Sequence, residues 1–248
     1  RKRTLFPYTT LFRSGATLAG LGLSVGAVLP GLPSHAEALS ESVAKFCKFE
    51  EFWARRLRRM EPVELPFASR SHASGAIWQK VAAAGLDGDD LVTALSLLFA
   101  RLARKNDFPL AYLPAAAGDQ PEWFTRYFAS VVPLPVHVQL QQPYAELREQ
   151  MARAIADTET KLSYLNDLPA REPDLRAVGD CAGYPIRVLR AADADELTAR
   201  RHGGTSALTI VVATNGGAVG FLADQAQIDR AGLARLLECF AVLCEAIK

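Results

Sequence analysis

The sequence has 248 residues, half of which are hydrophobic, and its formal net charge is +1. This apolar content, with 22% charged residues, excludes an intrinsically disordered chain. No basic stretch interleaved with aromatic residues is present, so the sequence gives no support for a nucleic-acid-binding surface. We therefore expect a globular protein with no nucleic-acid partner.

Residues 1–14 differ in character from the rest of the chain. Thr4 to Ser14 read TLFPYTTLFRS, which resembles the translation of a sequencing adapter. A segment of that origin has to be excluded from reasoning about the fold, because it was never selected to fit a core. We expect Arg1 to Ser14 to pack against nothing, and we expect the natural protein to extend further upstream.

Residues 15–39 form an apolar segment rich in glycine and alanine. Gly15 to Pro33 is followed by Ser34-His35-Ala36-Glu37-Ala38, which is similar to a small-residue cleavage site. Two interpretations stay open here: a true export signal, and an accident of the join to the preceding arginines. Glycine and proline interrupt the run, whereas a membrane span needs about twenty apolar residues, so we expect no membrane partner.

The cysteines, Cys47, Cys181, Cys239 and Cys244, form no Cys-x-x-Cys pair. Their spacing from the four histidines matches no metal-ligand pattern. We expect buried free thiols in a reducing cytoplasm, with no metal site and no cofactor bound directly to the chain.

Two amphipathic helices are predicted in the first half of the remaining chain. Ser40 to Arg59 spaces its apolar residues at steps of three and four, and the prolines of Glu61 to Phe67 end the pattern. A second helix, Asp90 to Lys105, follows the acidic run Asp87-Gly88-Asp89-Asp90, which is typical of a helix N-terminus.

The rest of the chain alternates between strands and helices. The expected strands are Phe108 to Leu113, Val131 to Val138, Tyr184 to Arg190, Ala207 to Ala213 and Ala218 to Ala223. Pro133 and Pro135 favour an edge or crossing position for their strand, and Asn215-Gly216 predicts a tight hairpin. Helices are expected at Tyr144 to Leu165 and Ile228 to Lys248. This order predicts an α/β fold, with helices packed on a mixed sheet of about four to six strands.

Three segments carry a family resemblance: FEEFWARRLRRMEPVELPF from Phe49, YFASVVPL from Tyr127, and NDLP from Asn166. Their order and spacing resemble the C-terminal lobe of the condensation domains of nonribosomal peptide synthetases. The resemblance covers Phe49 to Lys248 and implies a chloramphenicol acetyltransferase-like fold. We therefore expect residues 40–248 to be the C-terminal lobe, about half of such a domain, with an exposed apolar patch where the other half belongs.

The motifs match the family patterns in part. The first resembles the family helix that carries W-x-x-x-L and continues into a loop with Leu-Pro. In G-x-F-V-N-T-x-P-L-R the matching residues are Phe128, Pro133 and Leu134, and the departures are Arg126, Ser130 and Pro135. In H-Q-D-x-P-F the chain keeps Asp167 and Pro169, with Leu165 in place of His and Ala170 in place of Phe.

The resemblance implies that the whole domain joins acyl or peptidyl and aminoacyl groups through an amide bond. Those groups are tethered by phosphopantetheine to partner peptidyl carrier proteins, and neighbouring synthetase domains are further partners. The family's chemistry rests on His-His-x-x-x-Asp-Gly, which this sequence does not contain. His137 and His202 are interpreted as structural or solvated rather than catalytic. We expect no catalytic residue in this chain and no condensation activity from the chain alone.

Two further motifs are similar to those of serine hydrolases. Gly22-Leu23-Ser24-Val25-Gly26 matches the nucleophile elbow of serine hydrolases, and His202-Gly203-Gly204 is similar to their oxyanion loop. The first lies in a glycine-rich apolar run and the second follows it in the wrong order, so a hydrolase is disfavoured. The remaining alternative is a non-catalytic module, derived from a condensation domain, that docks a carrier protein or a neighbouring domain.

Overall fold

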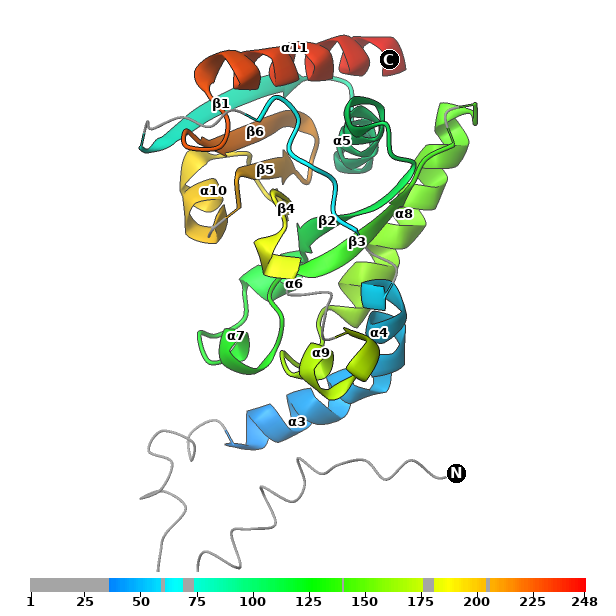
Figure 1. Cartoon of the computed structure of the whole chain (residues 1–248), viewed down its shortest axis with the longest axis vertical. Coiled ribbons are helices and arrows are strands. Elements are labelled where there is room, and N and C mark those ends of the chain that lie inside the picture. Colours follow the sequence, from blue (N-terminus) through cyan, green and yellow to red (C-terminus); the bar gives the residue numbers. More distant parts are fainter. Residues whose placement is uncertain (1–35, 59–60, 69–73, 140, 176–180, 204–205) are drawn as a thin grey trace, which may run out of the picture. The chain divides into compact units, whose positions relative to one another are not determined.

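The computed structural model describes residues 36–58, 61–68, 74–139, 141–175, 181–203 and 206–248 (Figure 1). It forms two compact units, Arg1–Lys45 and Phe46–Lys248. The first unit contributes most of helix α3 (Ala36–Phe46). The expectations for residues 1–14 and for residues 15–35 of the apolar segment lie outside the described residues and stay predictions, whereas residues 36–39 of that segment begin helix α3.

The second unit contains the sheet and most of the helices. Its strands are β1 (Ala76–Ala83), β2 (Asp107–Leu113), β3 (Val132–His137), β4 (Ile186–Ala191), β5 (Leu208–Ala213) and β6 (Gly217–Asp224). Its helices are α4 (Glu50–Arg58), α5 (Gly88–Ala103), α6 (Ala115–Gly118), α7 (Phe124–Tyr127), α8 (Tyr144–Lys161), α9 (Leu168–Arg171), α10 (Glu196–Gly203) and α11 (Arg230–Ile247). Short 3-10 turns lie at Cys47–Phe49, Pro173–Leu175 and Cys181–Gly183.

The strands form one six-stranded sheet in the order β1-β6-β5-β4-β2-β3. The pairs β2 with β4 and β4 with β5 are parallel, and the other neighbouring pairs are antiparallel. The sheet is therefore mixed, which confirms the expected α/β fold. The hairpin predicted from Asn215-Gly216 joins β5 to β6, and Gly216 has the positive φ of 76° that such a turn requires.

Strand β3 lies at one edge of the sheet, as its prolines predict. Its register places Pro135 opposite Pro109 and Pro133 opposite Ala111. Proline has no N–H to donate. The hydrogen bonds between β2 and β3 are therefore formed by the residues that alternate with the prolines, such as the pair Leu110 and Leu134. The prolines leave the pairing of β3 with β2 intact while weakening its outer edge as a template for another strand.

Helices α5, α8 and α11 pack together over the sheet (Figure 1), and the main core lies beneath them. Its large, fully buried side chains include Leu95 and Phe99 of α5, Phe221 of β6 and Phe240 of α11. Phe221 and Phe240 meet edge to face with ring centroids 5.5 Å apart. Helix α10 contacts β5 and β6. None of the described helices is both long enough and apolar enough to cross a membrane.

Several elements differ from the sequence expectation. Strand β1 was not predicted, because Gln79 and Lys80 interrupt its apolar pattern and its alanines have low strand propensity. No helix was expected at α10. The helix expected at Ser40 to Arg59 is divided by the 3-10 turn, and α8 ends at Lys161 because Leu162 adopts a positive φ of 54°.

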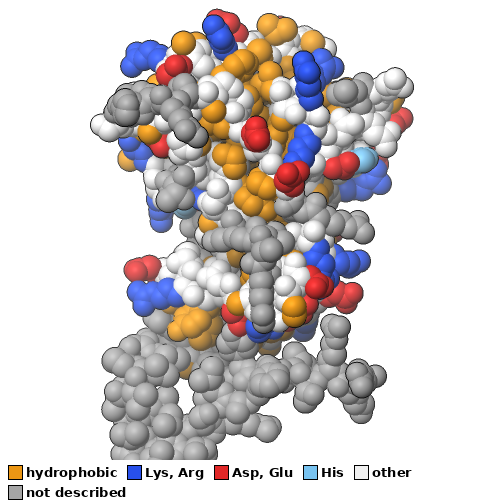
Figure 2. Space-filling view, viewed as in Figure 1, with side chains coloured by type: hydrophobic (Ala, Val, Ile, Leu, Met, Phe, Trp, Pro, Cys, Tyr) orange, Lys and Arg blue, Asp and Glu red, His pale blue; other side chains and the backbone are white. Residues whose placement is uncertain are grey.

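The large hydrophobic side chains that are exposed in the described part of the chain are Tyr127, Leu197 and Val242, on three different helices. Figure 2 shows further hydrophobic side chains along the middle of one face of the molecule, with charged side chains on both sides. The contiguous apolar patch expected for a half-domain stays a prediction.

Candidate functional site

A cavity of about 530 Å³ lies between two loops of the second unit. One loop follows α7 and contributes Phe128 to Val131. The other runs from the end of α8 into α9 and contributes Tyr164, Asn166, Pro169 and Ala170, with Ala182 nearby. We call them the 128–131 loop and the 164–170 loop. These loops contain the second and third segments that carry the family resemblance.

Backbone hydrogen bonds hold the two loops together. Phe128 and Leu165 form an isolated antiparallel bridge. On either side of it, the N–H of Ala129 donates to the carbonyl of Tyr164 at 2.9 Å, and the N–H of Asn166 donates to the carbonyl of Tyr127 at 2.9 Å. The fold therefore brings two motifs that are far apart in the sequence into one wall.

Side chains reinforce this pairing. The buried hydroxyl of Ser163 donates to the carbonyl of Ala129 at 2.6 Å, and the amide of Asn166 donates to the carbonyl of Thr125 at 3.1 Å. Behind the loops, the rings of Phe124 and Phe128 stack with centroids 4.8 Å apart. The wall is thus supported by hydrogen bonds on one side and by aromatic packing on the other.

The polar side chains that line the cavity are Thr125, Ser130, Tyr164 and Asn166. Hydroxyl and amide groups can donate and accept hydrogen bonds, but they do not exchange protons near neutral pH. Leu165, which stands where the family pattern has His, is buried and apolar. The cavity can therefore bind and orient a polar chain, and its described lining supplies no general base.

The chain's departures from the family patterns coincide with this cavity. Ser130 and Ala170 both line it, where the patterns have the larger Asn and Phe.

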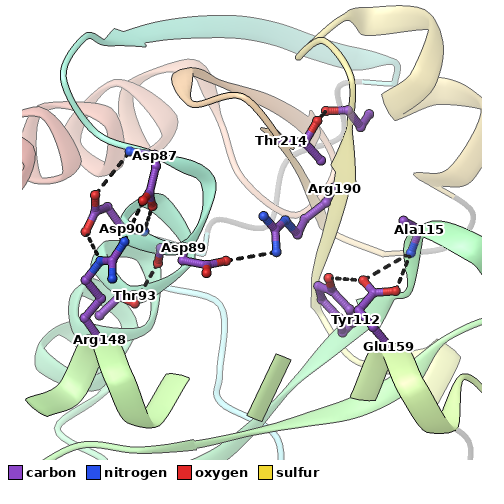
Figure 3. A network of polar contacts seen from close by, with 11 residues as sticks. Asp87, Asp89, Asp90, Thr93, Tyr112, Ala115, Arg148, Glu159, Arg190 and Thr214 are labelled. Atoms are coloured by element: carbon purple, nitrogen blue, oxygen red, sulfur yellow. Dashed lines mark hydrogen bonds and ion pairs between the residues drawn. The ribbon is translucent and has the colours of Figure 1, made fainter. Parts of the chain in front are cut away.

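A network of polar contacts, formed by residues that do not line the cavity, joins several elements of the second unit (Figure 3). Tyr112 on β2 donates its hydroxyl to Glu159 on α8 at 2.6 Å, and the same carboxylate accepts from the N–H of Ala115 at 3.1 Å. Burial raises the pKa of Tyr112, and the Glu159 carboxylate raises it further, so the phenol keeps its proton. Arg190 on β4 forms an ion pair with Asp89 on α5 at 2.9 Å. The network joins β2, β4, α5, α6 and α8.

The start of α5 belongs to the same network. The helix N-terminus predicted from the acidic run is confirmed, and Asp87 and Asp90 form a reciprocal capping box there. Arg148 of α8 donates to Asp90 at 2.6 Å and to Asp87 at 2.5 Å. Burial acts to raise the pKa of Asp87, but the N–H of Asp90 and the Arg148 guanidinium outweigh it, so the pKa is lowered. This cluster ties α5 to α8.

The two histidines interpreted as structural or solvated do not line the cavity. His137, at the end of β3, is exposed and pairs with Asp107 across the strand pair. His202 is half-buried near the end of α10, and its ring lies beside Gly118. Burial lowers the pKa of His202, and Arg201 and Arg187 lower it further. Ser24, of the nucleophile-elbow pattern, lies outside the described residues.

The four cysteines, all among the described residues, form no disulfide, and only two of them are buried. Cys181 and Cys244 lie in the interior, whereas Cys47 and Cys239 are partly exposed, so the expectation of four buried thiols was wrong for that pair. Burial, together with Glu50, raises the pKa of Cys47 to about 11, which disfavours the reactive thiolate. The described residues contain no group of three or more histidine, cysteine or acidic side chains placed to hold a metal ion.

Comparison with solved structures agrees with the resemblance. A mutant starter condensation domain of the rhizomide synthetase RzmA, in complex with C8-CoA and Leu-SNAC, aligns with a TM-score of 0.58 at 16% identity. The first condensation domain of the calcium-dependent antibiotic synthetase, in complex with a substrate analogue, aligns with a TM-score of 0.57 at 15% identity. The chain shares the fold of condensation domains. No family model and no curated protein matches the sequence.

The alignments cover most of this chain but only about half of each condensation domain. They cover 85% and 84% of this chain but only 54% and 52% of the two condensation-domain chains. The chain thus spans about half the length of the solved condensation domains it resembles.

Proposed function

We propose that this chain acts as the C-terminal half of a condensation domain. In that role it forms one wall of a site in which an amide bond joins an acyl or peptidyl group to an aminoacyl group. The fold shared with condensation domains supports this proposal. The observation that carries it is the meeting of the 128–131 and 164–170 loops in one hydrogen-bonded cavity.

The proposed role of the chain is to bind and position the substrates. The described lining of its cavity offers hydroxyl and amide groups but no base, and the sequence has no His-His-x-x-x-Asp-Gly motif. The proton-transferring histidine therefore has to come from a complementary N-terminal half. Positioning an amine against a thioester supplies much of the rate enhancement in such a reaction, so one wall without the other gives no catalysis.

The proposed partners are peptidyl carrier proteins and neighbouring synthetase domains in the cytoplasm. The carriers bring phosphopantetheine with the substrates, and this chain holds no cofactor of its own. A solved condensation domain of similar fold contains C8-CoA, whose pantetheine arm has the same chemistry as the carrier-bound group. The arm's amides match the hydroxyl and amide groups of the cavity wall.

A second candidate is a non-catalytic module that docks a carrier or a neighbouring domain. The departures at Leu165 and Ala170 favour it, because a site that has lost its family side chains is free to bind without reacting. The two candidates share the cavity and the partners, and they differ in whether amide formation follows when the N-terminal half is present.

Binding at the cavity can be tested directly. A pantetheine titration followed by nuclear magnetic resonance should perturb the amide signals of the 128–131 and 164–170 loops. Ala170→Trp should abolish these shifts by filling the cavity, whereas Ala156→Trp, at an exposed alanine of α8, should leave them unchanged. Shifts that are absent in the unmodified chain, or that survive Ala170→Trp, would count against the proposal.

A further inference from the structure

A groove of about 660 Å³ lies between α4 and the strand pair β2–β3, and it shares no residue with the cavity described above. Its polar side is formed by Arg55 and Arg56 of α4 and by His137 at the end of β3. Its apolar side is formed by side chains that include Phe52 and Phe108. We call it the α4–β3 groove.

Arg56 is held rigidly at this groove by neutral partners. Its Nη1 donates to the hydroxyl of Thr158 at 2.6 Å and to the carbonyl of Pro133 at 3.4 Å. The Thr158 hydroxyl donates its own proton to the carbonyl of Ala154 at 2.7 Å, so its oxygen is oriented to accept from Arg56. The guanidinium carbon lies 4.3 Å from the ring centroid of Phe52. A guanidinium has five N–H donors, and these bonds leave donors available for a ligand.

The Arg56 charge has no carboxylate within ion-pair distance in the described part of the chain. Asp157, whose charge acts on it from further away, is engaged with Lys161 at 2.8 Å. Burial lowers the pKa of Arg56 to about 10, and Asp157 opposes that effect only in part. Arg56 therefore stays protonated at neutral pH as a largely buried cation without a counter-ion. Removing a charge from water is costly unless it is paired, so an anion placed here would gain stabilisation.

The other charged residues of the groove do not remove the stabilisation that an anion would gain beside Arg56. Asp107 is the acidic residue of the lining, and it is already paired with His137. Arg55 is exposed and has no carboxylate partner among the described residues. The described lining holds two arginines and one aspartate, so the formal charges of these three residues sum to +1. The groove is therefore electrostatically suited to a single anionic group.

We propose that the α4–β3 groove binds an oxyanion, a carboxylate or a phosphate, carried on an apolar chain. The oxyanion accepts hydrogen bonds from Arg56 and Arg55, whose planar guanidinium groups match either group in geometry. The apolar chain lies against Phe52 and Pro135, which are both partly exposed, and covers apolar surface that is otherwise in contact with water. This inference stands independently of the proposed condensation function, because it rests on other residues.

The test measures binding of three probes to the full chain by isothermal titration calorimetry: hexanoate, hexyl phosphate and the neutral hexanamide. Hexanoate, hexyl phosphate or both should bind saturably, more tightly than hexanamide by at least about tenfold. A preference for hexanoate or for hexyl phosphate identifies which oxyanion the groove takes. Affinity for the anion should fall as salt concentration rises, because part of the groove is open to solvent.

Two variants locate the binding. Arg56→Gln should weaken anion binding by about tenfold or more, and Arg55→Glu should do so without disturbing the core, since Arg55 is exposed. Arg153→Glu, at an exposed arginine of α8, is the matched control and should bind as the unmodified chain does. If Arg56→Gln fails to fold, Arg55→Glu and the neutral probe decide the question. Equal binding of hexanamide, unchanged affinity in Arg55→Glu, or no saturable binding in the millimolar range would overturn the proposal.

Discussion

The backbone N–H of Ala129 donates to the carbonyl oxygen of Tyr164 at 2.9 Å, and this bond joins the two loops that enclose the cavity. The carbonyl of Ala129 in turn accepts from the buried hydroxyl of Ser163 at 2.6 Å. Ala129 is thus held through both of its backbone polar groups by the 163–164 segment. The two loops therefore act as one unit, and a change in one loop should be transmitted to the other.

The hydroxyl of Ser163 should contribute measurably to stability. Ser163→Ala leaves the buried carbonyl of Ala129 without this donor, and such a loss costs about 1–3 kcal/mol of unfolding free energy. Urea denaturation of the two proteins measures the difference. Thr160→Ala removes an exposed hydroxyl bond on α8 and should cost less. Equal losses in the two variants would contradict a special role for Ser163.

Close packing of Trp78 on Gly220 joins β1 to its neighbour β6. A Cβ atom added at Gly220 would lie 2.0 Å from the Trp78 ring, far inside contact distance. Gly220→Ala should therefore destabilise the fold by about 1–3 kcal/mol, and adding Trp78→Leu should restore part of the loss. At Gly183 an added Cβ meets nothing within 4 Å, so Gly183→Ala is the control. Similar thermal midpoints for the two alanine variants would show that the Trp78 contact is not formed.

The half-buried His202 should make the fold sensitive to mild acid. Its folded-state pKa is lowered by burial and by Arg201 and Arg187, relative to about 6.5 in the unfolded chain. The unfolded chain then binds the proton more readily, so stability is full above about pH 6.5 and is lost as the pH falls through the window below it. His202→Gln should lose less stability than the unmodified chain between pH 7 and pH 5, with both followed by urea denaturation. Parallel curves for the two proteins would contradict the assigned burial.

The sequence predicted those parts of the fold whose signals are local. The acidic run before α5 predicts the N-terminus of that helix, and Pro133 and Pro135 predict the edge position of β3. Strand β1 was missed because an exposed edge strand with Gln79 and Lys80 at its centre lacks the alternation of a half-buried strand.

The candidate site was predictable only in its parts. The resemblance marked the segments from Tyr127 and from Asn166, but their meeting depends on the nonlocal bridge between Phe128 and Leu165. No pattern in the sequence predicted the α4–β3 groove. Arg56 is polar and lies on a helix whose pattern predicts only one apolar stripe, and its burial follows from contacts with Thr158 and Pro133, which are distant along the chain.

The cavity should also control the reaction proposed for the whole domain. When the chain is combined with an N-terminal lobe, Ala170→Trp should reduce the rate of amide formation by at least about tenfold, because the filled cavity can no longer position the tethered substrate. Ala156→Trp provides the same bulk on an exposed face and should have little effect. Full activity of Ala170→Trp would show that the cavity does not position the substrate.

The most direct measurement of the central claim is peptide formation from two loaded carrier proteins, followed on the acceptor carrier by mass spectrometry. The chain alone should give no product above the uncatalysed background, because its sequence lacks the histidine motif and the described lining of its cavity offers no base. Addition of an N-terminal lobe that carries His-His-x-x-x-Asp-Gly should restore product. Product from the chain alone, or no product when the two lobes are shown to associate, would contradict its assignment as the C-terminal half of a condensation catalyst.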